Sequence, residues 1–110
     1  MAKRVAVNIP GVRVNETDCK VLRVIAGLAE QREGFRCAPV SVSRRELHEL
    51  VQKSEQTMIR SCRTLCREGL LVMTGNTMDN GAQVANSYEI TALGLEVIRM
   101  ADMLSAYMDE

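Results

Sequence analysis

Apolar positions recur at helical spacing in four separate stretches of this chain of 110 residues. These stretches cover residues 17–32, 44–51, 54–68 and 91–108. An Asn, Ser or Thr that can cap the first turn stands at or just before the start of each stretch. Gly34 and Gly69 follow the first and third stretches, and glycine commonly ends a helix. The pattern therefore predicts four helices, of which the last is the longest.

Three shorter stretches have the alternation or the β-branched residues that are typical of strands. Residues 37–42 predict one small strand between the first and second helices. Residues 70–74 and 87–90 predict the two strands of a β-hairpin. Residues 75–86, which connect them, are polar and contain glycine, so we expect a long loop there.

The first fourteen residues differ from the rest of the chain in charge. They contain Lys3, Arg4 and Arg13 but no acidic residue, and they fit a flexible arm or a short edge strand equally well. Residues 15–110 are expected to form one domain, because 46% hydrophobic and 25% charged residues are typical of a globular domain of this size. The predicted fold class is mainly α with a small β-hairpin, in the order α-β-α-α-β-β-α.

The formal net charge is zero, but the charges are unevenly distributed along the chain. Residues 1–69 hold thirteen Lys and Arg against eight Asp and Glu, whereas residues 70–110 hold one Arg against six acidic residues. This asymmetry favours a polyanionic partner on one face, although chance segregation accounts for it equally well. Aromatic residues make up only 3% of the chain, which nearly excludes a platform that stacks single-stranded bases.

Two short helices joined by a tight turn and followed by a hairpin are the parts of a winged helix-turn-helix. The segments that carry this pattern are residues 43–51, SEQTM at 54–58, LCREGLL at 65–71 and YEITALG at 88–94. In this order they resemble the winged-helix regulators of the MarR and PadR type, over roughly residues 40–100. The resemblance implies a protein that binds double-stranded DNA and regulates transcription, with its third helix in the major groove.

The third helix has a face suited to DNA. At about 100° per residue, Met58, Cys62 and Leu65 form one apolar stripe, which is the expected core contact. The opposite side carries a glutamine and three arginines: Gln56, Arg60, Arg63 and Arg67. An ordinary solvated face usually mixes both signs of charge, so this face favours contact with DNA over that alternative.

The resemblance places the first residues of this helix nearest the bases. Arg60 is then expected to contact guanine and Gln56 adenine through paired hydrogen bonds. Ser54 and Thr57 are expected to meet phosphate or a base at the helix N-terminus. Basic residues beside the turn are expected to bind phosphates: Arg44, Arg45 and Lys53. The expected wing loop holds no Lys or Arg, so we do not expect it to insert a cation into a minor groove.

The last helix is longer than a small winged domain requires. Leu93, Val97 and Ile98 are expected to pack on the domain itself. The later apolar residues of the helix would then lie beyond that core: Met100, Met103, Leu104, Tyr107 and Met108. An exposed apolar patch on a small protein usually marks an interface, so residues 91–108 predict a homodimer. The alternative is a helix that folds back on its own domain.

Other kinds of chemistry have little support in the sequence. Cys19, Cys37, Cys62 and Cys66 lack the spacing of a zinc knuckle and are expected to be reduced, structural thiols, so we expect no metal and no cofactor. His48 has no serine and aspartate pattern around it, and a phosphate-binding glycine motif is absent, so we expect no enzymatic activity. Without a candidate membrane span or signal-peptide core, the chain is expected to be cytoplasmic.

Two other functions stay open from the sequence. The same fold would serve a replication or partition protein of a plasmid or phage. It would also serve a module for protein–protein assembly that does not bind DNA. The zero net charge and the wing without cations favour assembly, whereas the arginines opposite the core favour DNA.

Overall fold

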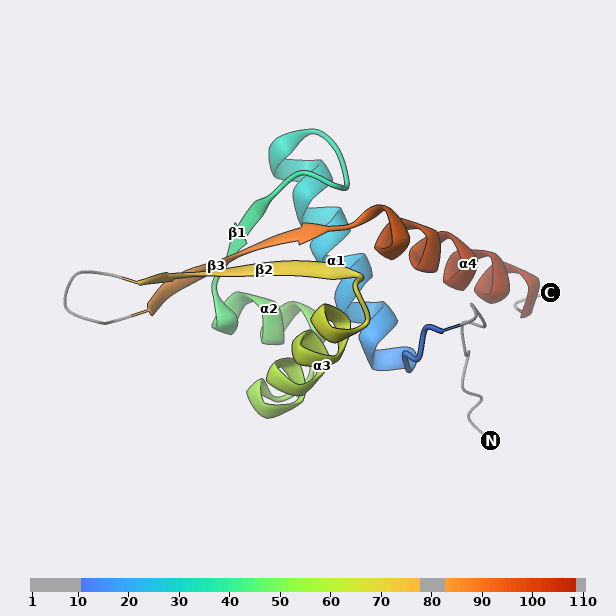
Figure 1. Cartoon of the computed structure of the whole chain (residues 1–110), viewed down its shortest axis with the longest axis horizontal. Coiled ribbons are helices and arrows are strands. Elements are labelled where there is room, and N and C mark those ends of the chain that lie inside the picture. The colour runs from blue at the N-terminus through green and yellow to red at the C-terminus, as the bar shows by residue number, and fades with distance from the viewer. Residues whose placement is uncertain (1–10, 78–82, 109–110) are drawn as a thin grey trace.

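The computed structural model describes residues 11–77 and 83–108, and the side chains of residues 11–75 and 86–103 among them. Within these residues it contains four helices and three strands (Figure 1). They are α1 (Glu16–Glu33), β1 (Val40–Val42), α2 (Arg44–Val51), α3 (Glu55–Arg67), β2 (Leu71–Thr77), β3 (Gln83–Ile90) and α4 (Ala92–Met108). The predicted order of elements is confirmed. Most of the expected N-terminal arm, including Lys3 and Arg4, lies outside the described residues.

Polar side chains cap the first two helices. Asn15 accepts a hydrogen bond from the N–H of Asp18 (2.8 Å), and the Asp18 carboxylate accepts one from the N–H of Asn15 (3.0 Å). These two bonds form a complete capping box at the start of α1. Ser43 accepts a hydrogen bond from the N–H of Glu46 (3.0 Å) at the start of α2. Ser43 and Glu46 also have the spacing of a capping box, but the Glu46 side chain contacts Arg32 instead.

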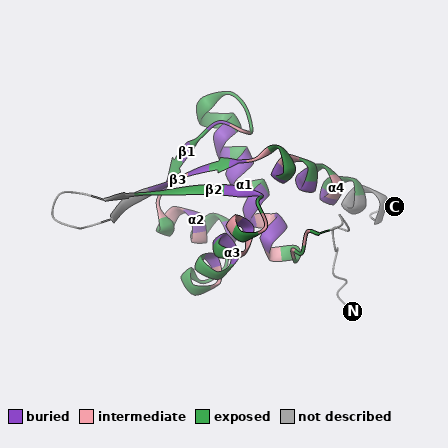
Figure 2. Cartoon of the chain, in the orientation of Figure 1, coloured by how far each residue is buried: buried purple, intermediate pink, exposed green. Residues whose placement is uncertain are grey.

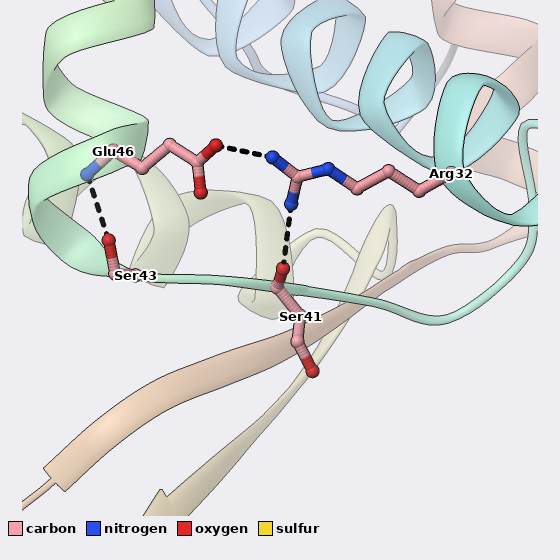
Figure 3. A network of polar contacts seen from close by, with 4 residues as sticks. All are labelled: Arg32, Ser41, Ser43 and Glu46. Carbon is pink, nitrogen blue, oxygen red and sulfur yellow. Dashed lines mark hydrogen bonds and ion pairs between the residues drawn. The ribbon is translucent and has the colours of Figure 1, made fainter.

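Arg32, near the end of α1, joins three elements of the fold (Figure 3). Its guanidinium donates a hydrogen bond to the carbonyl oxygen of Ser41 in β1 (3.1 Å) and forms an ion pair with Glu46 in α2. Glu46 is itself held by Ser43 through its backbone N–H. These contacts fix the start of α2 relative to α1 and β1. They therefore help to orient the pair of helices α2 and α3.

The three strands form one antiparallel sheet in the order β1-β3-β2. Val40 pairs with Tyr88, and Leu71 pairs with Ile90. The prediction of a long loop over residues 75–86 was wrong, because β2 continues to Thr77 and β3 begins at Gln83. Backbone hydrogen bonds between two strands need no apolar alternation, so a polar sequence can extend a hairpin beyond the part that packs on the core. The small strand that was predicted within residues 37–42 is β1, which lies at one edge of this sheet.

The core lies around α1, whose inner faces are buried (Figure 2). Helices α2, α3 and α4 and the strands β1 and β3 all contact α1. Val21, Leu22 and Ile25 of α1 are completely buried. Tyr88 is the one aromatic side chain in the described core, so aliphatic and sulfur-containing residues fill most of it, as the composition predicts.

Two apolar residues differ from their predicted positions. The helical spacing of Leu47, Leu50 and Val51 predicts one apolar side for α2, but Leu50 is 47% exposed, because this short helix turns only Leu47 and Val51 into the core. Leu93 was expected to pack on the domain but is 39% exposed. The buried side of α4 begins with Gly94 instead and continues through Val97, Ile98 and Ala101. Successive residues of a helix are about 100° apart, so Leu93 lies outside this buried side when Gly94 lies on it.

Gly94 lies where α4 meets the end of α3 and the sheet. A Cβ at this position would stand 2.3 Å from the carbonyl oxygen of Leu70 and 2.8 Å from a methyl carbon of Ile90. We predict that Gly94→Ala lowers the free energy of unfolding by about 1–3 kcal/mol, because the backbone of Leu70 must shift. Urea denaturation at one fixed protein concentration would measure this.

The matched control is Gly27→Ala in α1. A Cβ at Gly27 meets nothing within 4 Å, so this change should raise the free energy of unfolding by up to about 1 kcal/mol through helix propensity. Equal effects of the two substitutions would contradict the close approach of Gly94 to Leu70.

Candidate nucleic-acid interface

A tight turn connects α2 to α3. Gln52 ends α2 in a left-handed conformation (φ 66°), and its N–H donates to the carbonyl oxygen of His48 (2.8 Å). Lys53 follows, and Ser54 caps α3 by accepting a hydrogen bond from the N–H of Thr57 (3.2 Å). Residues 52–54 therefore make the short connection that is characteristic of a helix-turn-helix.

The inner face of α3 agrees with the predicted stripe. Met58, Cys62 and Leu65 are all buried, which confirms this part of the sequence analysis. Ser61 is buried beside them, although its polar side chain gave no indication of this.

A buried polar contact attaches α3 to α1. The hydroxyl of Ser61 donates a hydrogen bond to the carboxylate of Asp18, and both residues are only 4% exposed. The other carboxylate oxygen of Asp18 accepts the N–H of Asn15 at the start of α1. One carboxylate thus completes the cap of α1 and holds the middle of α3. The sequence analysis missed this pair, because 43 positions separate the two residues and no local pattern connects them.

The outer face of α3 is exposed, as Figure 2 shows. It carries the four residues predicted for it: Gln56, Arg60, Arg63 and Arg67. In the described part of the chain, Arg60 and Arg63 have no ion-pair partner, whereas the guanidinium of Arg67 lies 3.8 Å from the Glu68 carboxylate. The centre of this face therefore presents two cations that form no ion pair with another described residue.

The other candidate residues lie in the turn and in the first turns of α2 and α3. Lys53 and Ser54 are exposed, and the Ser54 and Thr57 hydroxyls are 2.9 Å apart. Arg45 is exposed and lies 3.7 Å from the carboxylate of Glu49, one turn along α2. Arg44 is exposed at the first position of α2. Lys53, Ser54 and Thr57 thus lie at the N-terminal end of α3, whereas Arg44 and Arg45 lie at the N-terminal end of α2, which is the end away from the turn.

Cys19, Cys62 and Cys66 have the surroundings of structural thiols. Cys19 and Cys62 are buried, and burial raises the pKa of Cys62 to about 12. Burial also raises the pKa of Cys66, although a hydrogen bond from the backbone N–H of Met73 opposes this effect. The thiolate forms are disfavoured at neutral pH, so these groups are poor nucleophiles. Among residues 11–77 and 83–108, no three His, Cys, Asp or Glu side chains cluster in a way that could hold a metal ion.

No protein-family model matches this chain, and no curated protein sequence matches it. Several solved structures are similar to it. The M. tuberculosis transcriptional regulator MosR has a TM-score of 0.62 at 19% identity, over 87% of this chain and 58% of MosR. S. aureus MepR, in a complex with DNA, has a TM-score of 0.59 at 10% identity, over 88% of this chain and 68% of MepR. A MarR-family transcriptional regulator from Silicibacter pomeroyi has a TM-score of 0.57 at 15% identity, over 84% of this chain and 53% of the regulator.

This chain has the winged-helix fold of MarR-family regulators. The fold predicted from the sequence is therefore confirmed, with α3 as the second helix of the helix-turn-helix and β2–β3 as the wing. The chain spans between about half and two thirds of the length of these regulators. In the described residues, no helix is long and apolar enough to cross a membrane.

We predict that Ser61→Ala lowers the free energy of unfolding by about 1–3 kcal/mol, because it leaves the buried Asp18 carboxylate without its hydrogen bond from α3. The measurement is urea denaturation of the two single variants Ser61→Ala and Asp18→Ala and of the double variant. A coupling energy near zero in this double-mutant cycle would show that the two side chains do not act together.

Proposed function

We propose that this chain binds double-stranded DNA sequence-specifically as a homodimer and thereby regulates transcription. The observation that best supports this proposal is the outer face of α3, where three arginines and a glutamine lie opposite the buried stripe of a helix-turn-helix. The thirteen residues of α3 give a helix about 20 Å long, which the major groove of B-DNA can accommodate. Guanidinium groups on this face would attract phosphates and donate hydrogen bonds to bases.

The N-terminal half of α3 is suited to base contacts. Arg60 and Gln56 are both exposed one turn apart, and Arg60 has no ion-pair partner among the described residues. A guanidinium can donate two hydrogen bonds to the O6 and N7 of guanine, and a glutamine amide can pair with the N6 and N7 of adenine. We therefore assign direct base recognition to Arg60 and Gln56.

The residues around the turn are suited to phosphate contacts. Ser54 and Thr57 carry hydroxyls at the start of α3, where backbone N–H groups also favour anions. Lys53 adds positive charge beside this point, and Arg44 and Arg45 add positive charge at the start of α2. Contacts of this kind fix the position of a protein on the duplex without distinguishing its sequence.

The similar structures support the proposal independently of the side chains. MosR is described as a transcriptional regulator, and MepR was solved in a complex with DNA. We propose the same role, DNA binding and regulation of transcription, for this chain, because it has the same fold and its α3 presents cations on the outer face. A regulator of this kind needs no catalytic group, and we propose no enzymatic activity for this chain.

The homodimer is proposed from α4. This helix has 17 residues and a length of about 25 Å, and it extends away from the sheet towards the C-terminus (Figure 1). Met103 is 70% exposed, whereas Met100 is partly buried against the core. The side chains of Leu104, Tyr107 and Met108, the other three residues proposed for the interface, lie outside the described ones. Two helices paired through this end would place two copies of α3 on one face of a duplex.

We predict that Arg60→Ala weakens binding to a preferred duplex by about 1–3 kcal/mol and relaxes the preference at one base pair. The preferred duplex would first be selected from a random pool with the wild-type protein. Fluorescence anisotropy would then measure the dissociation constants for this duplex and for a random one at several salt concentrations.

Arg99→Ala is the control for this experiment, because Arg99 is exposed on α4, away from α3, and lies 3.6 Å from Glu96. It should change neither constant. Equal losses of Arg60→Ala on both duplexes would reduce Arg60 to a phosphate contact. If the wild type bound no duplex even at low salt, the assembly module would replace DNA binding as the function.

We predict that the protein sediments as a dimer at micromolar concentration and that Leu104→Glu with Met108→Glu dissociates it. Two carboxylates would be buried at the proposed contact without partners, which is strongly unfavourable. Leu93→Glu is the control, since Leu93 is an exposed apolar residue at the opposite end of α4. A wild-type protein that remained monomeric and still bound a palindromic duplex tightly would contradict this prediction.

A further inference from the structure

Sulfur-containing side chains gather in one cleft between α2, α3 and the sheet. The cleft has a volume of about 470 Å³, and four of the residues that line it carry sulfur: Met58, Cys62 and Cys66 of α3 and Met73 of β2. They are half of the eight cysteine and methionine side chains that the structure describes. The cleft thus brings together the thiol and thioether groups that soft metal ions prefer as ligands.

Three of these residues follow one line along α3. Met58, Cys62 and Cys66 are four residues apart, so their side chains project from the same side of the helix, one turn after another. Residues at this spacing have Cβ atoms about 5–6 Å apart. Two metal–sulfur bonds of about 2.3 Å, the length of a zinc–thiolate bond, would place two sulfurs on opposite sides of one ion about 4.6 Å apart. The two cysteines therefore have a spacing that one ion can bridge.

The fourth residue brings the sheet to this line. The backbone N–H of Met73 donates a hydrogen bond to the sulfur of Cys66, so β2 lies against the last turns of α3 here. Cys62 is 5% exposed, whereas Cys66 is half-buried and Met73 is 42% exposed. An ion between the two cysteines would thus be shielded from water beside Cys62 and would be reached from solvent beside Cys66 and Met73.

We propose that this cleft binds one Cu(I) ion, with the thiolates of Cys62 and Cys66 and the thioether of Met73 as its ligands. Soft thiolate and thioether ligands select Cu(I). The ion keeps its oxidation state: it forms bonds to the two Sγ atoms, and each thiol releases its proton to solvent. The two thiolates supply the negative charge that a cation requires, so the site needs no carboxylate.

The ligand set distinguishes this site from a zinc site. Structural zinc usually takes four thiolate, imidazole or carboxylate ligands. In the part of the chain that the structure describes, no three side chains of these kinds cluster. The sequence analysis expected no metal because the cysteines lack the spacing of a zinc knuckle, an argument that does not apply to a monovalent ion held by two cysteines. The site is independent of the proposed function, because its ligands do not belong to the outer face of α3.

The first experiment tests for the ion and its position. Reduced protein is titrated without oxygen against the coloured complex of Cu(I) with bicinchoninate, from which it should withdraw one Cu(I) per chain. The bound ion should protect Cys66 from alkylation by iodoacetamide but not Cys37, which is also half-buried and does not line the cleft. Equal protection of both cysteines, or of neither, would overturn the site. Protection of Cys66 by Zn(II) as strong as that by Cu(I) would contradict the selection of a soft ion.

Substitutions of cysteine provide a matched set. Loss of a group that only orients a metal ligand typically costs about 10–100-fold in metal affinity, so Cys62→Ser and Cys66→Ser should each weaken Cu(I) binding at least about tenfold. Cys19→Ser is the control, because Cys19 is also 5% exposed but lies on α1, outside the cleft. It should leave the affinity unchanged. Met73→Leu keeps the apolar bulk without the sulfur and should weaken binding less than the loss of a thiolate does.

Two outcomes of this set would overturn the proposal. Unchanged Cu(I) affinity in both Cys62→Ser and Cys66→Ser would show that the ion binds elsewhere. An equal loss in Cys19→Ser would show that the substitutions act through the fold and not through the ligands. Because Cys66 is only half-buried, Cys66→Ser decides the test even if Cys62→Ser fails to fold.

Discussion

The packing of α3 against α1 determines which side chains of α3 are left for a partner. Met58, Cys62 and Leu65 supply the apolar part of this contact, and the bond from Ser61 to Asp18 supplies its polar part. Because a helix rotates by about 100° per residue, a small rotation of α3 would bury part of its arginine face and expose part of its stripe. A buried carboxylate with one specific donor resists such a rotation more strongly than interchangeable apolar contacts do. The contacts between α3 and α1 therefore determine which side of α3 faces outward.

A second set of contacts relates α4 to this helix pair. The Thr91 hydroxyl donates a hydrogen bond to the carbonyl oxygen of Gly69 (2.8 Å), and the N–H of Thr91 donates to the carbonyl oxygen of Leu70 (3.1 Å). Gly94 allows the first turn of α4 to approach Leu70 closely. An ion pair between Arg23 of α1 and Asp102 of α4 (2.9 Å) holds the helix further along. The direction of α4 is thus tied to the end of α3, so a dimer formed through α4 would have a defined distance between its two copies of α3.

The sequence contains local information, and the correct predictions are local ones. The spacing of Met58, Cys62 and Leu65 predicted the buried stripe, and Ser43, Ser54 and Thr91 predicted three helix starts. The contacts that differ or were missed depend on distant partners. Glu46 fits the pattern of a capping box but forms an ion pair with Arg32 of another helix. Leu93 was expected in the core, but Gly94 lies on the buried side of α4 and Leu93 is exposed. A cleft of about 470 Å³ between α2, α3 and the sheet was not predictable, because its lining comes from elements that are separated in the sequence and meet only in the fold.

The zero net charge of the chain makes the placement of each cation decisive. Arg45 and Arg67 lie within 4 Å of the carboxylates of Glu49 and Glu68, so part of their charge is offset within the protein. Arg60 and Arg63 have no such neighbour in the described residues, and they stand in the centre of the outer face of α3. A protein without net charge gains little long-range attraction to a polyanion, since the effects of distant charges cancel and salt screens them over about 10 Å. On the proposed function, its affinity for DNA would therefore come from close contacts at these two arginines and at the turn.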